Sequence, residues 1–415
     1  VRRKEVENRR GETEILPGGP VRQGRIFIEK EDVPPYNRYC KKYGGRETVI
    51  IRNGLVFQEN GTYRKQDLYI EKGRIVSSSR EVTDGQEMDA RGLKILPGLI
   101  DVHSHGAAGC DFSDGSLKGL EKILRYQKSC GVTTYCPTTM TLPEEKLLQA
   151  LSSVNAVQKE KDQAVIAGIH MEGPFLDPAR KGAHRADSLR CPDVEFFQRC
   201  QEACGGRIRL LTMAPNLAGA KELIRDVCGE TVVSLGHTDA DYDCASRAFD
   251  LGAAHVTHLY NAMAPFGHRC PGLVGAAFDY RQVMVELIAD GIHVHPCVVR
   301  STFSLFGRDR VVLISDSIAA AGMEDGVCLL SGQKVTVKDG KATLSDGTIA
   351  GCAVSLFTCM KRAIRFGVPE GDAVLAATAN PARSIGIYDE TGSLSPGKRA
   401  DLLVTDQDLN LLQVL

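Results

Sequence analysis

Six side chains that can bind a metal ion follow short apolar runs along this chain. His103 and His105 stand two residues apart in DVHSHG, so on an extended chain both imidazoles point to the same side. The other four candidates each follow a different run: Glu172 in IHMEGPF, His237 in LGHT, His258 in THLYNAM and Asp316 in ISDS. Imidazole nitrogens and carboxylate oxygens suit zinc, iron or another first-row divalent ion. The set therefore predicts a metal site.

A divalent ion in such a site predicts hydrolysis. It lowers the pKa of bound water to roughly 7, which makes hydroxide available for attack on an unactivated carbonyl. Each residue also has a plainer interpretation, because a single histidine at a strand end is usually structural, Glu172 alone would form an ion pair, and Asp316 would cap the next helix. The joint occurrence at successive strand ends favours the metal site. We assign His170 and His255 to the core or to a supporting role.

The elements that position these residues alternate between strand-like runs and helical patterns. The eight runs are ILPGLIDV, GVTTYCP, AVIAGIHM, RIRLLTMA, TVVSLG, AAHVTH, VMVELIAD and RVVLIS. Between them lie stretches with one apolar stripe, such as Leu117, Leu120, Ile123 and Leu124. This alternation is typical of an α/β fold with a parallel sheet, and eight units close most economically as a (β/α)8 barrel. Barrels of this type carry their active sites at the carboxyl ends of the strands, where the six candidates stand.

The remaining segments predict a small β-sandwich domain built from both chain ends. Residues 47–96 contain short β-type runs separated by Asn-Gly, Lys-Gly and Arg-Gly turns. Residues 323–350 are interpreted as a hairpin segment of the same small domain, and residues 387–415 as its last part. The barrel is expected over residues 97–322, with barrel-associated helices over residues 351–386.

Composition limits the classes of partner and compartment. With 51 basic and 52 acidic side chains and a pI near 6.9, no charge excess attracts nucleic acid or an anionic membrane. The 14 cysteines show no CxxC pair and no framework spacing, which is typical of reduced thiols in a cytoplasmic protein. No apolar run reaches the length of a membrane span. Residues 1–46 are a charged N-terminal extension, for which disorder is one interpretation.

Several short motifs resemble those of one known family, in the same order. They are HMEGPF (170–175), KGAH (181–184), LGHT (235–238), HLYNAM (258–263), RCPG (269–272), ADGIHV (289–294), SDSIAAAG (315–322), NPAR (380–383) and GKRADLLV (397–404). Together they resemble the N-acetylglucosamine-6-phosphate deacetylases of the amidohydrolase superfamily, from about Val49 to the end of the chain. The resemblance implies hydrolysis of an N-acetyl group from a phosphorylated amino sugar, giving glucosamine 6-phosphate and acetate.

The resemblance also implies a role for each site residue. Glu172, His237 and His258 would hold the main metal ion. His103 and His105 would allow a second ion, so one or two divalent ions, zinc or iron, are expected. Asp316 would act as general base toward water and then as general acid toward the leaving amine. Substrate contacts would come from His184, Asn261, the backbone of Ala262, Arg269 and His293.

Two of these substrate contacts have further implications. Arg269 would reach the phosphate from a neighbouring subunit, which implies a homodimer, and a guanidinium can hold a phosphate bidentately in a protein that is not basic overall. Its alternative interpretation is a surface or interface ion pair. An imidazole, His184 or His293, would stabilise the developing oxyanion.

Other functions remain open from the residues alone. The galactosamine isomer is an alternative substrate, because the orientation of one hydroxyl cannot be inferred from sequence. A cyclic amide or a dipeptide is disfavoured by EGPF, KGAH and HLYNAM, which fit a sugar-phosphate pocket. A non-catalytic scaffold barrel predicts gaps among the ligands, and none is missing here. A nucleotide-binding role lacks a P-loop motif.

Overall fold

The computed structural model describes residues 48–83 and 85–415. The N-terminal extension expected over residues 1–46 lies outside the described residues. Within the two described ranges, no helix is long and apolar enough to cross a bilayer. The cysteines in these ranges are free thiols.

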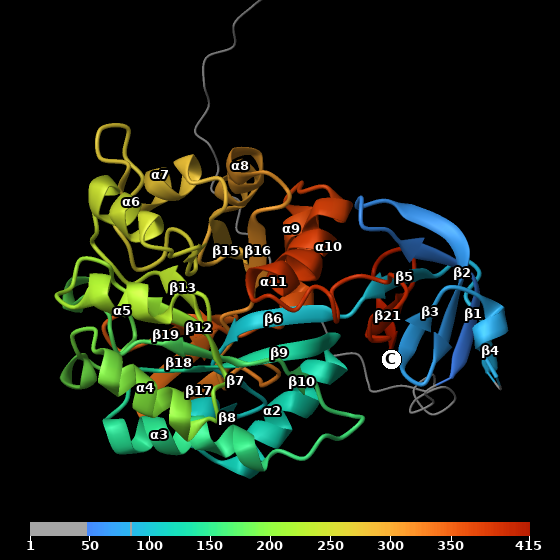
Figure 1. Cartoon of the computed structure of the whole chain (residues 1–415), viewed down its shortest axis with the longest axis horizontal. Coiled ribbons are helices and arrows are strands. Elements are labelled where there is room, and N and C mark those ends of the chain that lie inside the picture. The colour runs from blue at the N-terminus through green and yellow to red at the C-terminus, as the bar shows by residue number, and fades with distance from the viewer. Residues whose placement is uncertain (1–47, 84) are drawn as a thin grey trace, which may run out of the picture. The chain divides into compact units, whose positions relative to one another are not determined.

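A parallel barrel forms the centre of the fold (Figure 1). Each of the eight runs expected from the sequence supplies one strand, and consecutive strands are neighbours in a nine-stranded sheet that also includes the short β10 (Val165–Ile166). The barrel strands are β6 (Leu99–Ser104), β9 (Val132–Thr139), β11 (Ile169–Glu172), β12 (Ile208–Met213), β13 (Val232–Leu235), β14 (His255–Val256), β15 (Met284–Ile288) and β16 (Val311–Ile314). The (β/α)8 expectation is confirmed.

The barrel closes between its first and last strands, at their carboxyl ends. The backbone N–H of Asp316 donates to the carbonyl of His103 at 2.9 Å, and Ser104 and Ser317 form a parallel bridge. The strands are buried on both faces, as in β9, whose residues are all buried. Closure therefore brings the two ends of the strand series together at the same edge as the candidate ligands.

Helices cover the outside of the barrel because each carries one apolar stripe. In α2 (Leu117–Ser129), Leu120, Ile123 and Leu124 are buried, and Ser116 caps the helix by accepting from the backbone N–H of Gly119. The other barrel helices are α3 (Glu144–Ser153), α4 (Val194–Ala203), α5 (Ala220–Val227), α6 (Tyr242–Asp250), α7 (Gly272–Asp279) and α8 (Pro296–Phe306). Helices α9 (Leu356–Arg365), α10 (Glu370–Ala377) and α11 (Ala379–Ser384) follow near the end of the chain.

A second sheet combines strands from both ends of the described chain. Its seven strands are β1 (Val49–Phe57), β2 (Tyr63–Glu71), β3 (Arg74–Val76), β4 (Gln86–Asp89), β5 (Lys94–Pro97), β21 (Leu402–Thr405) and β22 (Leu411–Val414). In Figure 1 the red β21 lies beside the blue strands, and it pairs antiparallel with β5. The strands form one hydrogen-bonded sheet that branches at β1, which pairs with β2, β4 and β5.

Residues 323–350 differ from the sequence expectation. Instead of joining the small domain, they form most of a separate four-stranded sheet of β17 (Gly326–Leu330), β18 (Gln333–Lys338), β19 (Lys341–Thr343) and β20 (Ile349–Cys352). Leu330 and Val335 of this sheet pack in a cluster with Met140 and Ile318, which follow barrel strands β9 and β16. The alternating pattern predicts the hairpin strands, but it does not indicate which part of the protein their apolar face packs against.

Candidate metal centre and catalytic site

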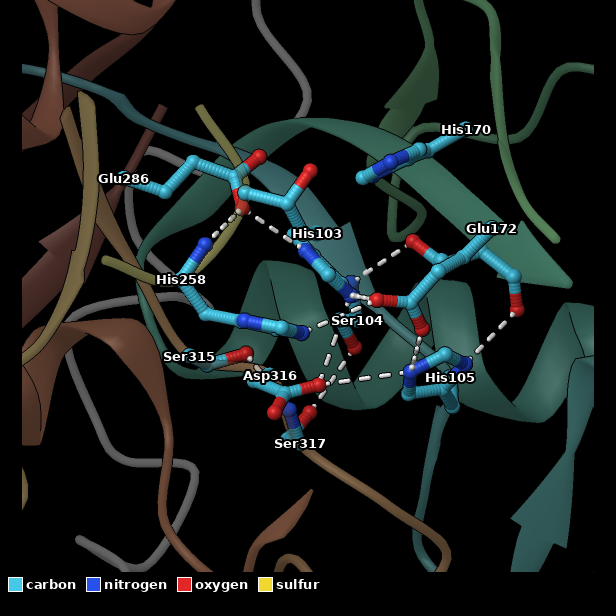
Figure 2. Close-up of polar contacts among 12 residues, drawn as sticks. His103, Ser104, His105, His170, Glu172, His258, Glu286, Ser315, Asp316 and Ser317 are labelled. Atoms are coloured by element: carbon cyan, nitrogen blue, oxygen red, sulfur yellow. Dashed lines mark hydrogen bonds and ion pairs between the residues drawn. The ribbon is translucent and has the colours of Figure 1, made fainter. Parts of the chain in front are cut away.

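The six candidates lie together at the carboxyl ends of the barrel strands. Figure 2 shows five of them, His103, His105, Glu172, His258 and Asp316, and His237 Nε2 lies 3.2 Å from Glu172 Oε1. His103 belongs to β6 and Glu172 ends β11, whereas the other four residues follow their strands directly or by one or two positions. His237, His258 and Asp316 have positive φ values of 48°, 27° and 49°. Non-glycine residues in this left-handed region are uncommon and cluster at functional sites. The backbone therefore turns sharply at three of the positions predicted to do chemistry.

Glu172 is the centre of the cluster. Its Oε1 lies 3.2 Å from His237 Nε2 and 3.1 Å from His258 Nε2. Its Oε2 lies 3.2 Å from His105 Nε2. In the triplet Glu172, His237 and His258, and in the triplet Glu172, His103 and His105, the donor atoms all lie within 4.8 Å of one another. One carboxylate therefore joins two sets of three ligands.

Hydrogen bonds on the far side of the rings set which imidazole nitrogen faces Glu172. His237 donates from Nδ1 to the carbonyl of Arg180 at 2.8 Å, and His105 from Nδ1 to the carbonyl of Thr138 at 3.2 Å. A carbonyl can only accept, so both Nδ1 atoms carry the proton and both Nε2 atoms keep a lone pair when the rings are neutral. Metal-binding histidines are held in this way in proteins.

The cluster fits a divalent cation on two further grounds. The Nε2 atoms of His237 and His258 face each other at 3.0 Å, and His103 Nε2 is buried without a hydrogen-bond partner. Burial would raise the pKa of Glu172, but His103 and His237 outweigh it and hold that pKa well below the usual range. Burial would likewise lower the pKa of His105, yet Asp316 and Glu172 raise it to about 9. The carboxylates thus require nearby positive charge, which a metal ion would supply.

Asp316 stands at the edge of the ligand set. Its Oδ1 lies 3.4 Å from His103 Nε2 and 3.3 Å from His105 Nε2. Burial would raise the pKa of its carboxyl, but His103 and His105 outweigh that effect and lower it. Its backbone is fixed on the other side by β20, where the N–H of Cys352 donates to the Asp316 carbonyl at 2.8 Å. Asp316 is therefore an ionised, rigidly placed acceptor beside the metal positions.

A cavity of about 380 Å³ opens over these residues. It is lined by Glu172, His237, His258 and Asp316, by four of the five expected substrate contacts, and by apolar residues that include Ile318, Leu330 and Ile349. The four contacts are His184, Asn261, Ala262 and His293. Arg269, the fifth, is exposed and does not line the cavity.

His184 differs from His105 and His237 in its tautomer. Its Nδ1 accepts from the backbone N–H of Thr141 at 3.1 Å, so in the neutral ring the proton is on Nε2, which donates to Glu172 Oε2 at 3.1 Å. Burial lowers the pKa of His184 to about 4, which keeps the ring neutral. His184 therefore offers a hydrogen-bond donor to the cavity and not a lone pair.

His293 offers a second donor. Its Nδ1 donates to Asp290 Oδ2 at 2.7 Å. Burial would lower the pKa of His293, but the bond to Asp290 outweighs it and raises that pKa. The ring therefore takes up a proton more readily than a free imidazole, and its protonated form can face an anionic group in the cavity.

Sequence reasoning missed two buried carboxylates beneath the ligands. Glu286, on β15, is fully buried and contacts His103 Nδ1 at 2.9 Å. Asp101, on β6, is fully buried and accepts a hydrogen bond from the hydroxyl of Ser315. The available signal was a charged residue inside an apolar run, VMVELIAD or LIDV, because such a residue must find a partner inside the barrel.

Comparisons with known proteins agree with this geometry. The model of the amidohydrolase family matches residues 95–414. The chain is 36% identical over 376 residues to N-acetylglucosamine-6-phosphate deacetylase of Bacillus subtilis (strain 168), covering 88% of this chain and 95% of the relative. It is 33% identical over 370 residues to N-acetylgalactosamine-6-phosphate deacetylase of Escherichia coli O157:H7, covering 88% and 97%.

The chain also resembles a solved structure in fold and sequence. It is a mutant of N-acetyl-D-glucosamine-6-phosphate deacetylase from Mycobacterium smegmatis in complex with N-acetyl-D-glucosamine-6-phosphate. It superimposes with a TM-score of 0.82 at 33% sequence identity, covering 89% of this chain and 98% of that one.

Proposed function

Because this chain belongs to the amidohydrolase family, we propose that it hydrolyses the acetamide bond of N-acetylglucosamine 6-phosphate, giving glucosamine 6-phosphate and acetate. The observation that carries the proposal is the position of Asp316, whose carboxylate lies 3.3 and 3.4 Å from two imidazoles of the Glu172 cluster at the floor of the cavity. An acceptor in that position can take a proton from water as the water attacks an amide carbonyl.

Glu172, His237 and His258 would hold one divalent ion, and His103 with His105 a second beside Glu172. When bound, such an ion supplies a Lewis acid for the amide carbonyl and a water of lowered pKa. Zinc and iron suit this mixture of nitrogen and oxygen ligands.

Asp316 moves the proton in the proposed mechanism. The oxygen of water bonds to the carbonyl carbon while the Asp316 carboxylate takes the water proton. The carbon–nitrogen bond then breaks, and the same carboxyl returns the proton to the departing amine. The immediate products are acetic acid and the amine. The proton of the acid then passes to the amine, giving acetate and the ammonium form, so atoms and protons balance without any further reactant.

His184 and His293 supply hydrogen-bond donors. The backbone N–H of Thr141 donates to Nδ1 of His184 and so leaves the proton on Nε2, where it suits the carbonyl oxygen as negative charge develops there. The ring of His293, when protonated, suits either that oxygen or the sugar phosphate. Asn261 and Ala262 line the same cavity and are proposed to contact the sugar.

The phosphate is proposed to bind Arg269 of a second subunit in a homodimer. Arg180, an arginine that lines the cavity, already pairs with Asp239 at 2.7 Å. Arg269 is exposed and outside its own cavity, which suits a residue that serves a neighbour. In Arg269→Ala we expect KM for the phosphorylated sugar to rise by about 10-fold or more, as for the loss of a charged hydrogen bond, and we expect wild type to be dimeric by light scattering.

A cytoplasmic location is part of the same proposal. A sugar phosphate carries charges that cross an apolar bilayer only at high cost, so the substrate stays where it is made. Immunolocalisation or fractionation of the native protein tests this point.

Acetate release by the metal-loaded protein tests the reaction. We expect turnover of N-acetylglucosamine 6-phosphate and far less turnover of unphosphorylated N-acetylglucosamine. Inactivity on every sugar phosphate with metal bound would overturn the proposal.

N-acetylgalactosamine 6-phosphate is a second candidate substrate, favoured by the 33% identity to the deacetylase of that isomer. The two isomers are compared by kcat/KM in the same assay. A higher value for the galactosamine isomer would reassign the substrate and leave the mechanism unchanged.

A further inference from the structure

Glu286 connects the two halves of the ligand set from below. It is fully buried on β15, and its Oε2 accepts two hydrogen bonds, one from His103 Nδ1 at 2.9 Å and one from the backbone N–H of His258 at 3.0 Å. Figure 2 shows Glu286 behind His103 and His258, on the side away from Glu172 and Asp316. One oxygen atom therefore holds a residue from β6 and the turn after β14.

The two bonds constrain different features of the ligands. An acceptor at Nδ1 keeps the proton of His103 on that nitrogen, so that its buried Nε2, which has no hydrogen-bond partner, presents a lone pair. The bond to the N–H of His258 holds a residue whose φ of 27° is unusual for histidine. Among the described residues, the buried Nδ1 of His258 also has no hydrogen-bond partner, so its ring adds no tether to the one that Glu286 gives its backbone.

The nearby His170 does not turn this carboxylate into a separate ion site. His170 Nδ1 donates to the carbonyl of Val102 at 3.0 Å, and His170 Nε2 lies 2.7 Å from the hydroxyl of Thr212. Both nitrogens are used within the barrel. Glu286 therefore acts on the ligands of the site above it.

We infer that Glu286 is a positioning residue that sets the metal affinity of the site by fixing the tautomer of His103 and the turn at His258. The inference rests on the proposed metal-dependent function but concerns binding of the ion, not the identity of the sugar. It predicts a larger loss at the His103 and His105 position than at the other, because Glu286 bonds the ring of His103 directly but only the backbone N–H of His258.

Zinc binding in Glu286→Gln tests the inference. The amide has nearly the shape of the carboxylate but no charge, so the two hydrogen bonds that Glu286 Oε2 now accepts from His103 and His258 lose their charge-assisted strength. Loss of such a supporting partner typically weakens binding by about 10- to 100-fold, and we expect that loss in competition with a chromophoric chelator. Zinc content after dialysis should fall first at the weaker position.

Ser234→Ala is the matched control. Ser234 is also buried inside the barrel and hydrogen-bonded, to Thr257 and His255, but it contacts no proposed ligand. It should lower thermal stability while leaving zinc content and affinity unchanged. Equal zinc affinity in folded Glu286→Gln and wild type would overturn the inference, as would an equal loss in Ser234→Ala.

A measurement on the wild-type protein covers the case in which Glu286→Gln does not fold. In zinc-loaded protein labelled with ¹⁵N-histidine, His103 should show a protected Nδ1 proton, assigned by its loss in His103→Asn. Finding His103 in the other tautomer would overturn the inference. Normal zinc binding together with no acetate release would count against the proposed substrate and leave the role of Glu286 standing.

Discussion

Two layers of histidines lie inside the same barrel, and they use their ring nitrogens differently. The upper layer consists of the histidines around Glu172. In it, His105 and His237 donate from Nδ1 to backbone carbonyls and direct Nε2 toward Glu172. The lower layer consists of His170 and His255. Both nitrogens of His170 have hydrogen-bond partners, the Val102 carbonyl and the Thr212 hydroxyl, and His255 Nδ1 lies 3.1 Å from the hydroxyl of Ser234. Both layers are buried histidines near a carboxylate, so burial alone does not identify a ligand. The informative feature is a ring with one nitrogen tethered and the other directed at a shared carboxylate.

The lower layer is also kept neutral. Burial lowers the pKa of His170 to about 3, and burial lowers the pKa of His255 as well. Hydroxyl groups connect the two rings, since Thr257 Oγ1 lies 2.6 Å from both Thr212 Oγ1 and Ser234 Oγ. A neutral hydrogen-bonded layer contributes stability, whereas the charged layer above it contributes chemistry.

The largest effect expected in the upper layer is on the chemical step. Asp316→Asn removes the proton acceptor but leaves Glu172 and the four imidazoles around it, so kcat should fall by about 10²- to 10⁴-fold with zinc content unchanged. Steady-state kinetics and elemental analysis on the same preparation check both halves. Retained turnover in a zinc-replete Asp316→Asn protein would mean that another group takes the proton.

Removing an upper-layer ligand should act on metal binding itself. In His237→Asn the triplet of Glu172, His237 and His258 loses one of its three donors. Zinc affinity should therefore fall by more than the roughly 100-fold upper range for loss of a supporting partner. Chelator competition measures the change. An affinity close to wild type would place the ion elsewhere and erase the difference between the two layers.

Chelation should destabilise the folded protein only where the upper layer is intact. An ion at 100 times its Kd stabilises the native state by about 2.7 kcal/mol, so wild type should lose that amount, and several degrees of Tm, when EDTA is added. His237→Asn should show little further loss. Differential scanning calorimetry with and without chelator makes the comparison, and equal shifts in both proteins would contradict it.

The smallest effect is expected in the lower layer. Thr212→Val leaves the buried Nε2 of His170 without its partner, which should cost about 1–3 kcal/mol in the free energy of unfolding. Urea denaturation of the zinc-loaded protein measures this cost. Zinc affinity should remain that of wild type, and a fall of 10-fold or more would show that the two layers are coupled.

The barrel and the positions of the candidate ligands were predictable because each strand is an apolar run and each candidate ends or closely follows one. His103, Glu172 and Asp316 could be placed at one edge because parallel strands share a carboxyl end. The roles of Asp316 and of the substrate contacts stay predictions. For Arg269, a contact that depends on a second subunit cannot be read from one chain.

Other features depended on distant contacts that local patterns do not encode. Glu286 lies inside the run VMVELIAD, and its partners His103 and His258 become neighbours only when the barrel closes. Residues 323–350, which form most of the four-stranded sheet, are expected in the small domain because their alternation is that of any half-exposed hairpin. The sheet packs instead on Met140 and Ile318, in the loops after β9 and β16. Met140 is distant in sequence, and Ile318 lies in a loop, so neither contact follows from the local pattern.

The pairing of β5 with β21 makes assembly of the small sheet a late event in synthesis. A ribosome releases β5 long before β21, and pairing at such sequence separation is slow. Until β21 arrives, one edge of β5 exposes unpaired backbone groups, which can pair with a strand of another chain. The barrel is synthesised during this interval, so a nascent chain carries this unpaired edge through most of its own translation.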